Sequence, residues 1–192
     1  MNGATVSCDT TTFSNNAQLY WQYNCDKIWL TLENVRKNKF IIDEVPVDLF
    51  NLTYRLGYHL IKEYSNSLLF RSGCPANGPC IYTLIDKDNG KKLKEFDQLI
   101  CIDTDVKWEN AHKYNFDFIV YFSDKADHLI IYYVDSNRTL KVPFKEKLTG
   151  IIPQHQFDEM TLENNTLTLF YELDSNTKKT LKIDLNDKKY SR

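Results

Sequence analysis

The five cysteines, Cys8, Cys25, Cys74, Cys80 and Cys101, are the residues whose type and spacing allow the widest range of chemistry. A cysteine pair can form a disulfide, bind a metal ion or supply a nucleophile. Five residues separate Cys74 from Cys80, and they include two prolines and an Asn-Gly step that turn the chain back. We therefore predict a disulfide between these two, with free thiols as the alternative. A structural zinc site is not expected, because its cysteines usually come in closely spaced pairs or with histidines.

Nucleophilic catalysis would require Cys25 or Cys101 to lie beside a histidine that acts as base. No local signature supports such a pair, and the Asp127-His128 step is interpreted as a turn aspartate beside a surface histidine. Phosphate-binding glycine loops, the G-x-S-x-G elbow and the H-E-x-x-H zinc motif do not occur in the sequence. We therefore favour a protein without catalytic activity, and we expect neither a metal ion nor a cofactor. The histidines considered are His59, His112, His128 and His155.

Aromatic residues are the stronger indication of function. They cluster in two predicted strand regions, and about half of the residues in an alternating strand face solvent. Exposed tyrosine and tryptophan side chains form contact surfaces for protein partners or sugars. We predict a binding role for these residues, with filling of the core as the alternative. The candidates are Tyr20, Trp21, Tyr23 and Trp29 in the first region, and Tyr132 and Tyr133 in the second.

These candidates have to be positioned by strands, because composition and alternation both predict a mainly β fold. The sequence has 12 tyrosines and 11 phenylalanines, and aromatic and β-branched residues favour pleated surfaces. Apolar and polar residues alternate most regularly at 167–173 and 181–185, on either side of an Asp-Ser-Asn turn. We expect an antiparallel meander, a β-sandwich or an open barrel.

Similar turns recur along the chain and leave a second architecture open. Ile85-Asp86, Val134-Asp135 and Leu173-Asp174 each end an apolar run before a polar turn. Intervals of about 40 to 50 residues would suit the blades of a propeller. A small β-propeller-like repeat is therefore the alternative fold.

One segment of the sequence can be interpreted in two ways. Leu49, Leu52, Leu56 and Leu60 recur at helical spacing, which predicts one short helix around residues 48–62. Gly57 and the aromatic, β-branched content of the segment oppose a helix. A hairpin that runs from 58–64 into 67–71 is the second interpretation.

The N-terminus indicates export. Thr5-Val6-Ser7 precedes Cys8 as the last positions of a lipoprotein signal precede the lipidated cysteine, and a polar tail follows. A plain disordered N-terminus is the alternative. We expect a flexible tail over residues 1–16 and a single β-rich domain over residues 17–192. The net charge of −2 gives no field that would attract nucleic acid, so a membrane would be contacted only through a lipid on Cys8.

Tyr23-Asn24-Cys25-Asp26, together with Ser72-Gly73 before Cys74, resembles the membrane-bound lysozyme inhibitor lipoproteins over about a quarter of the chain. That resemblance implies a β-barrel and a Ser-Gly inhibitory loop. Our main hypothesis is broader: a non-catalytic bacterial binding protein, periplasmic, envelope-attached or secreted, that contacts a protein or a glycan at the cell surface. The alternatives are a lysozyme-inhibitor-like lipoprotein and a small cytoplasmic enzyme or immunity-type protein with reduced thiols.

Overall fold

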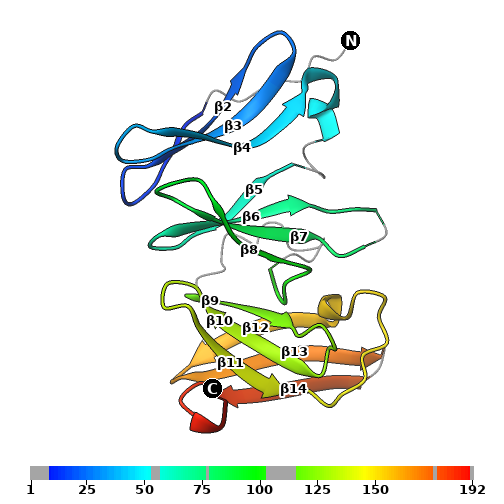
Figure 1. Ribbon diagram of the computed structural model, residues 1–192. Helices are drawn as coiled ribbons and strands as arrows, with labels where there is room; N and C mark the ends of the chain where they lie inside the picture. The colour runs from blue at the N-terminus through cyan, green and yellow to red at the C-terminus, as the bar shows by residue number, and fades with distance from the viewer. Residues whose placement is uncertain (1–8, 53–56, 77, 103–115, 175–176, 191–192) are drawn as a thin grey trace. The chain divides into compact units, whose positions relative to one another are not determined.

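The computed structural model describes residues 9–52, 57–76, 78–102, 116–174 and 177–190. Over these residues the chain is mainly β, with fourteen strands in four antiparallel sheets and three short 3-10 helices (Figure 1). Each sheet is a meander in which strands adjacent in sequence pair with one another, and none of the described sheets closes into a barrel. The mainly β, antiparallel fold class predicted from the sequence is confirmed.

The chain divides into two compact units, residues 1–95 and 96–192. The first unit holds two four-stranded sheets and the 3-10 helix η1 (Val47–Leu52). One sheet contains β1 (Thr11–Thr12), β2 (Gln18–Tyr23), β3 (Lys27–Glu33) and β4 (Lys39–Pro46). The other contains β5 (His59–Glu63), β6 (Ser67–Gly73), β7 (Ile81–Asp86) and β8 (Lys92–Phe96), which ends at the boundary between the units. That residues 17–192 form a single domain stays a prediction.

The two sheets of the first unit enclose a common apolar core. Alternation along β2 and β3 places Leu19, Leu30 and Leu32 on the face that meets Leu68 and Phe70 of β6. Trp21, Ile42, Tyr58 and Leu60 pack around this cluster with part of their surface exposed. One face of the β1–β4 sheet is thereby buried, and its other face carries a mixture of polar, aromatic and aliphatic residues.

Part of the N-terminal segment belongs to this packing. Thr11 and Thr12 pair with β2, and Phe13 is 5% exposed within the core. The Ser14 backbone N–H and hydroxyl both donate to Glu63 Oε1, at 2.9 and 2.6 Å, and Lys87 Nζ donates to the same oxygen at 2.9 Å. Residues 11–14 of the segment expected to be a tail are therefore fixed against the sheets.

The β5–β8 sheet is apolar on both faces. Phe70 of β6 faces the core described above, whereas Leu69 on the same strand and Leu84 on β7 point to the opposite side. Leu69, Leu84 and Tyr82 are all at most 1% exposed. A continuous apolar run such as Leu68-Leu69-Phe70 is typical of a strand that is covered on both sides.

The short helix predicted around residues 48–62 is present only at its start, as a 3-10 helix, and the last residues of the segment form a strand instead. The helical element η1 ends at Leu52, residues 53–56 lie outside the described part of the chain, and residues 59–63 form β5. Leu60 lies opposite Phe70 in the β5–β6 pair. The hairpin interpretation is thus confirmed, because pairing with β6 and burial in the core outweigh the local leucine spacing.

The second unit also contains two sheets, of three strands each. They are formed by β9 (Phe118–Phe122), β10 (His128–Tyr133) and β11 (Arg138–Pro143), and by β12 (Phe157–Glu163), β13 (Thr166–Asp174) and β14 (Thr177–Asp184). The 3-10 helices of this unit are η2 (Pro153–Gln156) and η3 (Lys188–Tyr190). Leu167 lies opposite Ile183 and Leu169 opposite Leu181, as the alternation in this hairpin predicts. Phe122, Phe144, Phe157 and Tyr171 form a ring cluster with centroid separations of 5.0 to 6.0 Å.

Candidate functional site

The face of the β1–β4 sheet that points away from the core carries a regular grid of side chains, which we call the outer platform. Its rows follow from the strand register and are Gln22, Trp29 and Glu44, then Tyr20, Thr31 and Ile41, then Gln18, Glu33 and Lys39. A register shift between Leu30 and Thr31 marks a β-bulge opposite residues 41–43. The bulge explains why Ile41 and Glu44, three positions apart, share one face.

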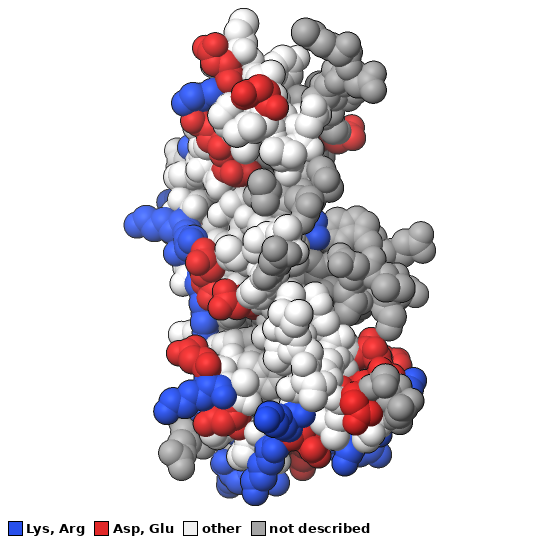
Figure 2. Space-filling view, turned by 90° about the vertical axis from the view of Figure 1, so that its right-hand side faces the viewer, with Lys and Arg blue, Asp and Glu red and all other residues white. Residues whose placement is uncertain are grey.

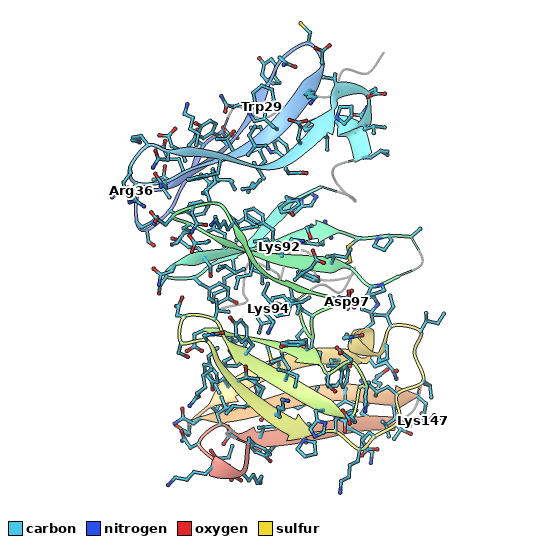
Figure 3. The ribbon with its side chains drawn as sticks, viewed as in Figure 1. Trp29, Arg36, Lys92, Lys94, Asp97 and Lys147 are labelled. Atoms are coloured by element: carbon cyan, nitrogen blue, oxygen red, sulfur yellow. A yellow bond between two sulfur atoms is a disulfide. The ribbon has the colours of Figure 1, made fainter. Side chains whose placement is uncertain are left out.

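Gln22 is held in one orientation by its neighbours on β3. Its Oε1 accepts hydrogen bonds from Trp29 Nε1–H at 3.2 Å and from the Thr31 hydroxyl at 2.8 Å. Trp29 stands on β3 (Figure 3) and is partly exposed, whereas Thr31 is only 1% exposed. Among the described residues nothing accepts from the Gln22 amide nitrogen, so its two N–H donors remain for a ligand.

Glu33 is the centre of a second network on the platform. The Tyr20 hydroxyl donates to Glu33 Oε2 at 2.8 Å, and Lys37 Nζ lies 3.0 Å from Oε1. These two contacts, in that order, hold the pKa of the Glu33 carboxyl below its usual value. Burial and the bond to Glu33 raise the pKa of the Tyr20 hydroxyl. At neutral pH Glu33 is therefore a carboxylate and Tyr20 a neutral donor.

The other charges of the platform are also paired. Lys27 Nζ lies 2.6 Å from Glu44 Oε1, and this contact raises the pKa of the Lys27 ammonium group. Lys39 Nζ lies 3.8 Å from Glu33 Oε2 and 5.8 Å from the centre of the Tyr20 ring. Figure 2 shows one face of the molecule, on which both acidic and basic side chains occur and a broad area between them carries neither. The platform thus combines aromatic and amide groups with carboxylates that are already occupied.

The four aromatic residues predicted on the first strand pair have separate positions. Tyr20 and Trp29 lie on the outer platform. Trp21 faces the core, where its ring meets Phe50 of η1 edge-on at 5.6 Å. Tyr23 is on the core-facing side of β2 but lies at the end of the strand, where it is 63% exposed. Two of the four therefore belong to the candidate site.

Tyr132 and Tyr133 lie on β10 in the second unit. Tyr132 is 7% exposed, and its hydroxyl donates to Asn137 Oδ1 at 3.0 Å. Tyr133 is partly exposed, and the Arg138 guanidinium lies 4.2 Å from the centre of its ring. Tyr132 is therefore positioned to fill the core, and the cationic group of Arg138 already covers the Tyr133 ring.

The predicted disulfide is present: Cys74 and Cys80 are bonded, with their Cα atoms 4.1 Å apart. Ser72 and Gly73, which carry the resemblance to an inhibitory loop, are the last residues of β6, and the Ser72 hydroxyl bonds with that of Thr83 at 2.8 Å. Cys25 is an exposed thiol, and Cys101 Sγ lies 3.9 Å from the Phe157 carbonyl oxygen. Cys8 and His112 lie outside the described residues.

The turn between β9 and β10 contains the residue types of a catalytic triad, but their hydrogen bonds are those of a turn. The Ser123 hydroxyl donates to Asp127 Oδ1 at 2.8 Å and accepts from the His128 backbone N–H at 3.2 Å. His128 Nδ1 shares the same carboxylate oxygen at 2.8 Å. The contacts with His128 and Ser123 lower the pKa of Asp127. A nucleophilic serine would instead donate to the imidazole.

Metal ligands, a membrane-spanning helix or a known family would each be a further indication of function. Over the described ranges, no group of three or more His, Cys, Asp or Glu residues could hold a metal ion. In the same residues, no helix has the length and apolar character that crossing a membrane requires. No protein-family model matches the chain, and no curated protein matches its sequence.

Tyr20 and Trp29 were expected from their residue types, whereas the polar residues beside them, Gln22 and Thr31, were not. Gln22 and Thr31 join the site because the β2–β3 hairpin turns at Asn24-Cys25-Asp26 and brings Gln22 opposite Trp29. The Asn24 side chain accepts from the backbone N–H groups of Asp26 and Lys27, at 2.9 and 2.8 Å, which fixes this turn. Counting outward from that turn would have identified both residues.

Proposed function

We propose that the chain is a non-catalytic binding protein of the cell envelope and that the outer platform contacts its ligand. The observation that carries this proposal is the orientation of Gln22: two donors from β3 occupy its oxygen and leave its N–H groups for a ligand beside Trp29. A group fixed before binding loses little conformational freedom when it binds. Contact rather than bond cleavage is the chemistry that this arrangement supports.

Export with a lipid on Cys8 forms part of the proposal. The disulfide between Cys74 and Cys80 supports it, because such bonds persist in oxidising compartments. Asp9 is the first described residue, and two residues later Thr11 joins the β1–β4 sheet. A tether at Cys8 would therefore hold the first unit, which carries the platform, close to the surface to which it is attached.

Retention on isolated bacterial cell envelopes tests the platform separately from the anchor. The full chain with Cys8→Ala should sediment with envelopes, and adding Trp29→Ala should release most of it. Phe170→Ala is the matched control, because Phe170 is an aromatic residue that is 37% exposed on β13 in the second unit. Retention that is equal with and without Trp29 would refute the platform as the binding site.

A further inference from the structure

We infer that the ligand of the outer platform is a neutral sugar, which stacks on Trp29 and accepts a hydrogen bond from the Gln22 amide nitrogen. The inference rests on the proposed function and adds the chemical class of the ligand. Three properties of the platform carry it: its size, its paired charges and the two kinds of contact that remain unused.

Size separates a glycan from a protein partner. The platform is three side chains long and three strands wide. With the usual spacing along and between strands, its footprint measures about 13 Å by 10 Å, or about 130 Å². A stable protein interface covers about 800 Å² on each partner. Ile41 is 60% exposed beside Thr31 and is the only aliphatic side chain among the nine, so the platform offers little aliphatic surface beside its two aromatic rings.

Charge separates a neutral ligand from an anionic one. Lys27 is paired with Glu44, and Glu33 lies within 4 Å of Lys37 and Lys39. A phosphate or a uronate would have to displace one of these partners, because anion sites use charge-assisted or bidentate donors. A neutral hydroxyl can add to the network without breaking a pair.

The contacts that remain available match a sugar ring. A pyranose has an apolar face formed by C–H groups and an edge formed by hydroxyls, so it needs an aromatic surface and fixed polar groups side by side. Trp29 is fixed through Nε1, and the exposed part of its ring can stack on a sugar, while the Gln22 amide is fixed by the same bond. The Gln22 N–H groups would then donate a hydrogen bond to a hydroxyl oxygen of the sugar.

Thr31 is a positioning residue in this site. It is 1% exposed and therefore out of reach of a ligand, yet its hydroxyl donates the shorter of the two bonds to Gln22 Oε1. Thr31→Val keeps the shape and removes the donor. Gln22→Glu keeps an oxygen for Trp29 and Thr31 but replaces the free N–H donors by an acceptor. Thr31→Val therefore tests whether the Gln22 amide must be held in place, and Gln22→Glu tests whether its N–H groups bind the ligand.

Titration of the full chain, followed by NMR at the Trp29 indole N–H and the Gln22 side-chain N–H₂ signals, tests the inference. The probes are cellotriose, chitotriose and maltotriose, with trigalacturonate as the charged comparator. We expect at least one neutral trisaccharide to shift both signals at up to about 10 mM, which would nearly saturate a site with a Kd of about 1 mM. Binding should weaken at least about tenfold in Trp29→Ala and in Gln22→Glu. Thr31→Val should weaken it less, and Phe170→Ala should leave it unchanged.

Three outcomes overturn the inference. The first is that no neutral probe shifts either signal, and the second is that a neutral probe binds equally well in Trp29→Ala. The third is that trigalacturonate alone shifts the two signals. If envelope retention still depends on Trp29 in the first or third case, the proposed function stands and only the ligand class is wrong. If retention is also independent of Trp29, both fail.

Discussion

The β1–β4 sheet and the β5–β8 sheet are both four-stranded meanders, yet they differ in how many of their faces are buried. On β3, apolar Leu30 and Leu32 alternate with Trp29, Thr31 and Glu33, which face outward. On β6, Leu68, Leu69 and Phe70 follow one another, and all are 0% exposed. The first pattern leaves a face on which polar groups can be arranged for a ligand. The second commits both faces to packing, so substitutions in the two sheets should have different consequences.

The largest effect is expected inside the β5–β8 sheet. Phe70→Ala should lower the free energy of unfolding by about 3–5 kcal/mol and Leu69→Ala by about 2–5 kcal/mol, because each removes fully buried apolar volume. Urea unfolding would measure both losses. If Leu69→Ala were nearly neutral while Phe70→Ala were costly, the far face of this sheet would not be packed and the comparison would fail.

Breaking the ion pair between Glu63 and Lys87 should cause the next largest loss in the free energy of unfolding. Glu63→Gln takes the carboxylate from Lys87, whose side chain is 1% exposed. Breaking a fully buried pair costs about 3–5 kcal/mol, and because the Glu63 side chain is 30% exposed we expect about 2 kcal/mol. Glu33→Gln on the platform should cost less, since water can solvate Lys37 and Lys39.

The Glu63 carboxyl group should also make the stability of the fold depend on pH. Burial opposes ionisation of Glu63, but the bonds from Ser14 and Lys87 outweigh it and lower the pKa of Glu63 in the folded state. A lowered folded-state pKa gives stability that is complete above the unfolded value of about 4.3 and is lost as the pH falls through the folded value. Acid unfolding of the wild type should therefore be steeper below about pH 5 than that of Glu63→Gln. Parallel curves would show that the carboxyl has the same affinity for protons in both states.

Removal of the disulfide should lower the free energy of unfolding by about as much as Glu63→Gln, or by slightly less. Cys74 and Cys80 are six positions apart, so the bond closes a short loop. Its contribution through the unfolded chain is about 2 kcal/mol. A double Cys→Ser variant should lose that amount in urea unfolding under non-reducing conditions. Equal stability of the wild type with and without reductant would show that the bond does not stabilise the fold.

The smallest effect on stability, with the largest on binding, is expected at Trp29. Its side chain is half-buried on the outer face of the sheet, so Trp29→Ala should cost about 1–2 kcal/mol, clearly less than Phe70→Ala. Sugar titration of the same variant should show the loss of binding described above. A loss of stability as large as that of Phe70→Ala would mean that Trp29 belongs to the core.

The sequence allowed the strands to be predicted better than the site. Alternation at 167–173 and 181–185 determines which residues face the core, and the pairing of Leu167 with Ile183 follows from it. The segment 47–64 was ambiguous because leucines at helical spacing fit a helix locally, whereas the pairing of Leu60 with Phe70 depends on a distant strand. For the site, aromatic residue types indicated Tyr20 and Trp29. The partners Gln22 and Thr31 could be identified only from the register of the hairpin. The packing of Trp21 against the core and the burial of Tyr132 depend on which face of each strand is covered.

The occupied carboxylate of Glu33 also determines where sheet packing must end. Stacking another apolar sheet onto the platform would remove water from Lys37 and Lys39, which pair with the already buried Glu33, and desolvating an ion costs several kcal/mol. Hydrophobic association of two copies through this face is thereby disfavoured. This holds even though β4 is an edge strand of the sheet and its Ile41 side chain is exposed. If the platform binds a small ligand as proposed, the same charges would also oppose its burial against a second apolar sheet.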